Sequence, residues 1–153
     1  MKAKFRPLII ALLAFPVALQ AADDPDSAAS DPVLQQAREA ASRKDYAAAA
    51  KILRDALART PANPDYHNLY AYTVRKGPAP NLDLVFKHYN EALRLEPKHR
   101  GAHEYIGEAY LMVGNVQKAR EHLTQLDRLC FFGCEEYSSL KNAIREYEAK
   151  GAR

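Results

Sequence analysis

Apolar residues recur every three or four positions along most of the chain after residue 30, which is the period of a half-buried helix. Three such stretches each follow an Asp or Asn. Asp45 precedes YAAAAKILRDAL, Asn81 precedes LDLVFKHYNEAL, and Asn115 precedes VQKAREHLTQL. Side chains of this kind accept hydrogen bonds from the free N–H groups of a first helical turn. The pattern therefore predicts three helices that begin directly after these capping residues.

The composition of this part of the chain also favours helices. Ala, Leu, Glu, Lys and Arg dominate it, β-branched residues are scarce, and no run alternates apolar with polar residues. Two of the three helices stop close to a proline, Pro61 and Pro97, which cannot continue a helix without losing a backbone hydrogen bond. We therefore predict an all-α fold.

A repeat of about 34 residues arranges these helices in pairs. Residues 30–63 and 64–99 each place an alanine at the small packing position of a first helix and end near a proline, and the second segment has two extra residues in its turn. Residues 100–133 contain HEYIGEAYLMVGNVQKA. Across these three segments the chain resembles the tetratricopeptide repeat family, whose period is the same.

The resemblance implies an α-solenoid of three tetratricopeptide helix hairpins plus a C-terminal capping helix at residues 134–150. A short hairpin cannot bury its apolar face alone, so hairpins stack and the last one needs a cap with a polar back. In EEYSSLKNAIREYEAKG, Leu140 and Ile144 fall on one face and Lys141 on the other. The third repeat departs from the family at Phe131, where a proline is usual.

The N-terminus has the pattern of a secretory signal peptide. Residues 1–21 combine a cationic start with an apolar stretch, and small residues follow at Ala21 and Ala22. The apolar stretch is short and contains Pro16, which disfavours a membrane-spanning helix and leaves an uncleaved anchor as the alternative. Residues 22–29 read as a flexible leader. We expect a periplasmic or secreted protein that is not inserted in the membrane after cleavage.

Signal cleavage also changes the charge. The chain has 22 Lys and Arg against 19 Asp and Glu, and three of the cations lie in the signal peptide, so the remainder would be neutral. Nucleic acid is then an unfavourable partner, because its binding relies on a concentrated cationic face. We expect one monomeric domain of about 130 residues.

No motif indicates catalysis, and we expect neither an enzyme nor a cofactor. A phosphate loop, a zinc-protease helix and a serine elbow are all missing from the sequence. His99 and His103 stand four apart, as metal ligands can, but His103 takes a position where the repeat usually buries an aromatic ring, so no metal is expected. His88 and His122 occupy equivalent places in two second helices, which suggests an outer face.

In proteins that resemble this one, the first helices line a concave groove. The resemblance implies a groove that is cationic in the middle, acidic further on and edged with apolar residues, which suits a protein or peptide segment. The alternative is that Arg75 only pairs with Glu104 or Glu108 across neighbouring hairpins. These two glutamates also argue against the family members that clamp a C-terminal carboxylate. The implied partner-binding residues are Leu34, Arg38, Asn68, Tyr72, Arg75, Lys76, Glu104, Glu108, Leu111 and Met112.

The only two cysteines, Cys130 and Cys134, lie in CFFGC. Their spacing and the Glu that follows exclude a c-type haem site. A thiol-redox or copper site remains the alternative function, with His122 and Met112 as conceivable further ligands. Export favours a disulfide, because an envelope compartment is oxidising. We therefore expect an exported interaction scaffold in which this disulfide fixes the corner between the third repeat and its cap.

Overall fold

A computed structural model describes residues 31–151, and every regular element in that part of the chain is a helix. The predicted signal peptide and leader lie outside the described residues. The seven helices are α1 (Pro32–Ser42), α2 (Tyr46–Arg59), α3 (Pro64–Lys76), α4 (Leu82–Leu95), α5 (Arg100–Met112), α6 (Val116–Leu129) and α7 (Glu135–Gly151).

The predicted capping residues are confirmed. The side chain of Asp45 accepts a hydrogen bond from the N–H of Ala48, and Asn81 and Asn115 do the same for the third residue after each of them, all at 3.0 Å. These bonds satisfy donors that the first turn of a helix leaves free. The second helix of each hairpin therefore begins where the sequence pattern places it.

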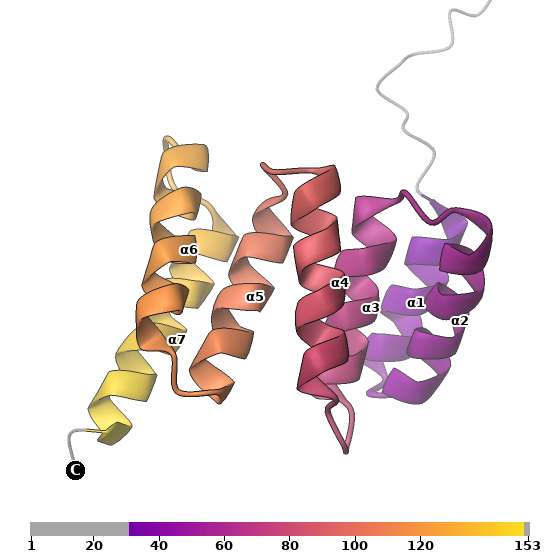
Figure 1. Cartoon of the computed structure of the whole chain (residues 1–153), viewed down its shortest axis with the longest axis horizontal. Helices are drawn as coiled ribbons and strands as arrows, with labels where there is room; N and C mark the ends of the chain where they lie inside the picture. Colours follow the sequence, from indigo (N-terminus) through magenta and orange to yellow (C-terminus); the bar gives the residue numbers. More distant parts are fainter. Residues whose placement is uncertain (1–30, 152–153) are drawn as a thin grey trace, which may run out of the picture.

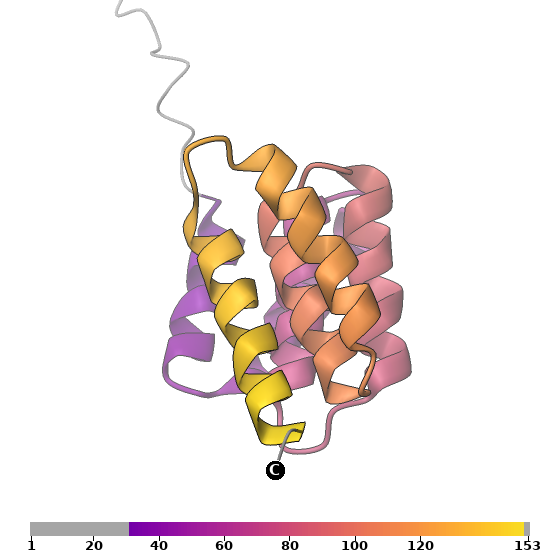
Figure 2. The same ribbon diagram turned by 90° about the vertical axis from the view of Figure 1, so that its left-hand side faces the viewer.

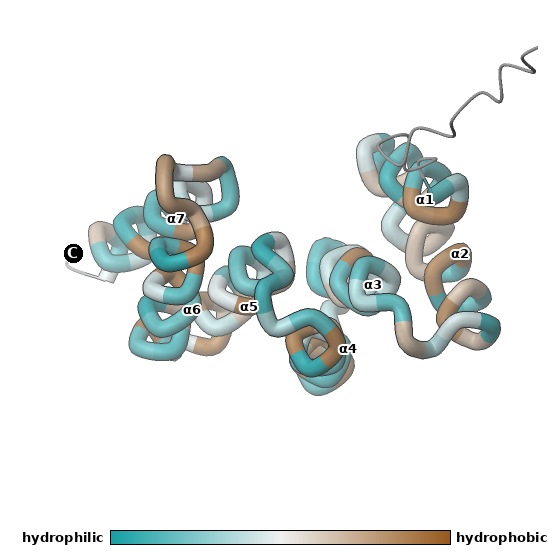
Figure 3. The backbone as a smooth tube through the Cα atoms, turned by 90° about the horizontal axis from the view of Figure 1, so that it is seen from above, coloured by the Kyte–Doolittle hydropathy of each residue, from teal (hydrophilic) through white to brown (hydrophobic). Residues whose placement is uncertain are grey.

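The helices form two rows. The chain steps from the α1–α2 hairpin at one end to α6 and α7 at the other (Figure 1). Seen from above, α1, α3, α5 and α7 make one row and α2, α4 and α6 the other (Figure 3). In that view α1 and α7 lie higher in the picture than α3 and α5, so the odd-numbered helices form a concave face. The predicted α-solenoid of three hairpins and a capping helix is confirmed.

Three apolar clusters hold the rows together. The first joins α1 and α2 to α3 around Leu53, which is fully buried, and the second joins α3 and α4 to α5 around Tyr89 and Ile106. The third joins α5 and α6 to α7 around Leu126 and Leu140. Each cluster takes residues from two neighbouring hairpins, or from the last hairpin and the cap, so no hairpin has a core of its own.

The capping helix packs a leucine against a glycine of the last hairpin. A Cβ added to Gly107 would meet the side chain of Leu140 at 2.6 Å, so the missing side chain of this glycine leaves room for Leu140. Leu140 is fully buried, and Ile144 lies one turn further along the same face. Figure 2 shows α7 packed across the end of the molecule beside α6. In the part of the chain described, no helix is both long and apolar enough to cross a bilayer.

Candidate functional site

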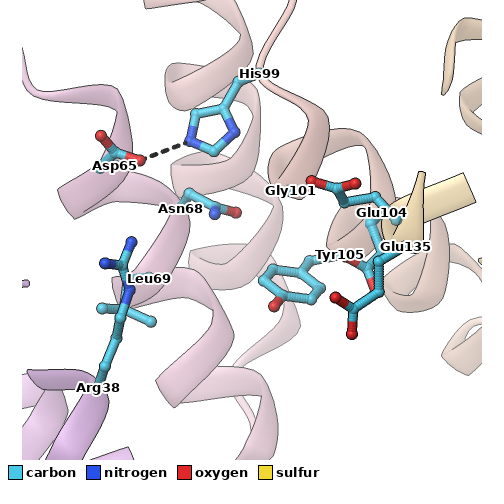
Figure 4. A pocket seen from close by; sticks show the side chains of 10 residues that line it. Arg38, Asp65, Asn68, Leu69, His99, Gly101, Glu104, Tyr105 and Glu135 are labelled. Carbon is cyan, nitrogen blue, oxygen red and sulfur yellow. Dashed lines mark ion pairs between the residues drawn. The ribbon is translucent and has the colours of Figure 1, made fainter. Parts of the chain in front are cut away.

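The concave face contains a pocket of about 330 Å³ at its centre. α1 and α3 form one wall, and the start of α5 and the start of α7 form the other (Figure 4). The pocket is therefore built from all four odd-numbered helices. Its lining residues are Arg38, Asp65, Asn68, Leu69, His99, Gly101, Glu104, Tyr105, Glu135 and Glu136.

A second hollow of about 260 Å³ adjoins it along α1 and α3. The two hollows share Arg38, Leu69 and Tyr105, and the second adds Ala41, Ser42 and Tyr72. We call the two together the concave groove. Its floor is the Leu69 side chain with the rings of Tyr72 and Tyr105, whose centroids lie 4.9 Å apart.

Arg75 does not reach this groove as a free cation. Its side chain is 4 % exposed, and its guanidinium lies 5.7 Å from the ring centroids of both Tyr72 and Tyr105. One terminal nitrogen is 2.7 Å from a Glu108 carboxylate oxygen, and Nε donates to the Tyr89 hydroxyl at 3.2 Å. Arg75 therefore pairs with Glu108 of the neighbouring hairpin, as the alternative interpretation of the sequence held.

The buried guanidinium remains charged. Burial acts to lower the pKa of Arg75, but Tyr89 and the Glu108 carboxylate outweigh it and raise that pKa above its usual value. Burial also raises the pKa of Tyr105 to about 12, so its hydroxyl stays protonated at neutral pH. The cation thus joins α3, α4 and α5 beneath the groove.

Apart from Arg75 and its partner Glu108, the predicted groove residues divide into three sets. Arg38, Asn68, Tyr72 and Glu104 line the concave groove. Leu34 and Leu111, by contrast, are buried in the first and third apolar clusters and offer a partner no surface. Lys76 and Met112 are exposed at the C-terminal ends of α3 and α5 but line neither hollow.

Several groove residues were missed because the sequence argument considered only the first helices of the three repeats. The capping helix α7 takes the place that a fourth first helix would have, so Glu135 and Glu136 at its start complete one wall. The sequence of α3 offered a further signal for two missed groove residues. Asp65 lies three residues before the predicted groove residue Asn68, and Leu69 follows it directly. His99 was assigned to a turn, and it caps α5 at the rim of the pocket.

The central pocket is acidic, whereas the sequence predicted a cationic middle. The reason is that Arg75 is withdrawn beneath the tyrosines, while four carboxylates line the opening. Burial raises the pKa of Glu104 to about 7, and neighbouring carboxylates act in the same direction. The pKa of Asp65 is lowered, chiefly by the imidazole of His99 beside it.

The tautomer of neutral His99 follows from its two contacts. Its Nδ1 accepts from the N–H of Ala102 at 3.2 Å, so the ring proton must sit on Nε2. Nε2 lies 3.3 Å from a carboxylate oxygen of Asp65, although the two are not aligned for a hydrogen bond. The cap of α5 thus lies beside Asp65, which stands at the mouth of the pocket (Figure 4).

Two histidine pairs link first and second helices. The Nδ1 atoms of His67 and His88 are 2.8 Å apart, and those of His103 and His122 are 2.9 Å apart. His88 and His122, which the sequence placed on an outer face, are only half-exposed, because each packs against the histidine of the preceding helix. Periodicity placed them on the second helix, but it could not show that each meets another imidazole.

Each pair has one arrangement of protons when both rings are neutral. Nε2 of His67 lies 2.9 Å from the carbonyl oxygen of Pro61, and Nε2 of His103 lies 3.0 Å from that of Pro97. A carbonyl only accepts, so both Nε2 atoms carry a proton and both Nδ1 atoms accept from the partner ring. Doubly protonated pairs would bring two N–H groups face to face, so each pair holds one positive charge at most.

The cysteines lie away from the groove, at the turn between α6 and α7. Their Cα atoms are 5.6 Å apart, a separation that a disulfide can bridge. Both Sγ atoms and a carboxylate oxygen of Glu136 lie within 4.8 Å of one another. Phe131 and Phe132 between them are almost fully exposed.

Comparison with known sequences relates the chain to a repeat-containing protein. No protein-family model matches the chain. A stretch of 80 residues, 52 % of the chain, is 32 % identical to a TPR repeat-containing thioredoxin, TTL4, of Arabidopsis thaliana. The chain spans only 11 % of the length of that relative.

Solved structures share the fold. Two structures of the type III secretion translocator chaperone SycD of Yersinia enterocolitica superpose on 80 % of the chain, with TM-scores of 0.67 and 0.65. The first is described as an alternative dimer. The matches cover 93 % and 85 % of those chains at 14 % and 13 % identity, which establishes a common architecture.

Acid should destabilise the fold through the histidine pairs. Burial and the neighbouring imidazole lower the pKa of His88 and of His122 to about 4, against about 6.5 in an unfolded chain. Between pH 4 and pH 6.5 the unfolded state therefore binds more protons than the folded state. The contribution of the neutral histidines to stability is complete above pH 6.5 and is lost as the pH falls towards 4. After allowance for solvent screening, the free energy of unfolding should fall by roughly 2 kcal/mol in all.

Urea unfolding followed by circular dichroism at pH 7.5 and pH 4.5 measures this loss. Glu104 acts in the opposite direction, because its raised pKa makes the folded state bind the extra proton. The matched control is a His88→Asn, His122→Asn variant, whose amide N–H can replace each Nδ1 donor without titrating. Its stability should fall less with acid, and an unchanged pH dependence would contradict the assignment.

Proposed function

Because the chain is a helical repeat protein of tetratricopeptide type, we propose that it is a protein-interaction scaffold that binds a segment of a partner in the concave groove. The observation that carries this proposal is the groove itself, which runs across α1, α3, α5 and α7 and is lined by aromatic and charged side chains. Such a surface can pack against side chains and hydrogen-bond a backbone at the same time.

The shape of the groove favours an extended segment over a small molecule. The two hollows share Arg38, Leu69 and Tyr105, so a chain that passes through both would contact the adjacent rings of Tyr72 and Tyr105 as well as the acidic pocket. A small ligand is usually enclosed by mainly apolar walls, whereas this pocket is open and largely polar. The resemblance to SycD, described as a chaperone of secreted translocators, supports a protein ligand.

We further propose export to the periplasm or beyond, and action as a monomer. The signal-peptide pattern of residues 1–21 supports export. In an oxidising compartment Cys130 and Cys134 would join as a disulfide that closes the turn before α7. A five-residue ring removes little chain entropy, so its contribution is the angle of the capping helix, which forms one wall of the groove.

The second candidate is a small thiol-redox or copper-handling protein. The observation in its favour is the cluster of two sulfur atoms and the Glu136 carboxylate. Soft thiolate ligands suit copper(I). Copper binding requires both cysteines to be reduced and a redox role requires them to be readily reducible, whereas the scaffold requires them only to hold the turn.

Site-specific photocrosslinking tests the groove. A photoreactive residue in place of Ser42, which is exposed and lines the second hollow, should capture a defined partner in cells that express the protein. The matched control replaces Ala58, an exposed residue of α2 on the other row. Capture of the same products from both positions, or from neither, would contradict binding in the groove.

Intact-mass measurement of protein from the cell envelope tests export and the disulfide together. The mass should correspond to a chain lacking residues 1–21, and an alkylating agent should add nothing unless a reductant is present. Reduction should then allow two additions, at Cys130 and Cys134. Full alkylation without a reductant, especially with about one copper per chain that Cys134→Ser loses, would favour the thiol or copper function instead.

A further inference from the structure

One end of the concave groove has a buried hydrogen-bond acceptor without a donor. Asn68 is 8 % exposed, and its Oδ1 is buried without a hydrogen-bond partner in the described part of the chain. Figure 4 shows its amide directed from α3 towards the space in front of Glu104 and Tyr105. A buried polar atom without a partner costs free energy unless a ligand satisfies it.

The nearby carboxylates differ in whether they are neutralised. Asp65 faces His99, Glu108 pairs with Arg75, and Glu136 lies 3.6 Å from Arg100. These three therefore each have a basic neighbour.

Glu104 and Glu135 have no ion-pair partner among the described residues. Glu104 is only 8 % exposed, and Glu135, at the start of α7, lies beside it on the same wall of the pocket (Figure 4). A buried carboxylate without a cation is costly, and a protein normally retains one only when a proton or a ligand compensates it.

Together these groups make a site that lacks one component, a hydrogen-bond donor with positive charge. We propose that Asn68, Glu104 and Glu135 form a subsite for a cationic side chain of the partner, an arginine guanidinium. This inference rests on the proposed function, because the guanidinium belongs to the segment that the groove binds. A guanidinium has five N–H donors, and Asn68, Glu104 and Glu135 line the same pocket and offer it acceptors.

Arginine fits better than lysine for two reasons. The planar guanidinium presents donors in several directions, as three separate acceptors require. Tyr105 lines the same pocket, and an aromatic ring attracts a cation placed near its face. Arg38, on the opposite wall, repels a bound guanidinium and so favours its position at the end near α5 and α7.

Binding at this subsite depends on pH through Glu104. The carboxylates of Glu108, Glu135 and Glu136 surround it, the Ser139 hydroxyl faces it from α7, and Asn68 and Arg38 face it across the pocket. The pKa of Glu104 is about 7 in the free protein. If only the ionised form binds the cation, affinity falls about tenfold between pH 8 and pH 6.

Titration of the labelled full chain with N-acetyl-argininamide, followed by NMR at the Gly101 and Tyr105 amides, tests the subsite. N-acetyl-citrullinamide is the control probe, because it has nearly the same shape without the charge. Saturable shifts are expected for the arginine probe, with affinity about tenfold lower for citrulline. Glu104→Gln should weaken arginine binding by a similar factor and remove its pH dependence.

The matched control variant is Glu121→Gln, an exposed carboxylate of α6 that pairs with Lys118 outside the groove. It should bind the arginine probe as the unmodified protein does. Equal affinity for the two probes, or unchanged arginine binding in Glu104→Gln, would overturn the subsite.

The two proposals can fail separately. A partner captured at position 42 together with equal binding of both probes would refute the cation subsite alone. Selective arginine binding without capture at position 42 would refute the scaffold function and leave the subsite standing.

Discussion

The buried cation Arg75 is the interaction on which the middle of the solenoid depends. Stacked hairpins normally hold together through apolar contacts between neighbours. Here the guanidinium joins α3 to Tyr89 of α4 and to Glu108 of α5, beneath the rings of Tyr72 and Tyr105. A charge this deep is stable only with its partners in place, so the second and third hairpins have one favourable arrangement.

That arrangement determines the chemistry of the concave face. Because Arg75 lies under the tyrosines and is neutralised there, it adds no positive charge to the surface above it, and Arg38 on the far wall is the arginine that lines the groove. Glu104, one turn before Glu108 on α5, is left without a cation and faces the groove beside Glu135 of the capping helix. The same packing that stabilises the hairpins thus leaves an acidic pocket for a partner. The position of α7 matters for function as well as for capping.

Local features of the structure were predictable, and features that depend on neighbouring hairpins were not. The caps Asp45 and Asn115 and the three hairpins follow from short-range patterns, so the sequence predicted them correctly. Periodicity shows which residues share a helix face, but it does not show how deep each one lies. For this reason Leu111 was assigned to the groove although it is buried, and the contact of His88 with His67 was missed.

The stability of a double variant tests the role of Arg75 most directly. Glu108→Gln alone leaves a buried charge without its partner and should lower the free energy of unfolding by about 3 kcal/mol. Arg75→Met removes the charge and keeps much of the apolar stem, so in urea unfolding Arg75→Met, Glu108→Gln should be more stable than Glu108→Gln alone. Losses that simply add would show that the two side chains do not depend on each other, and would contradict the account.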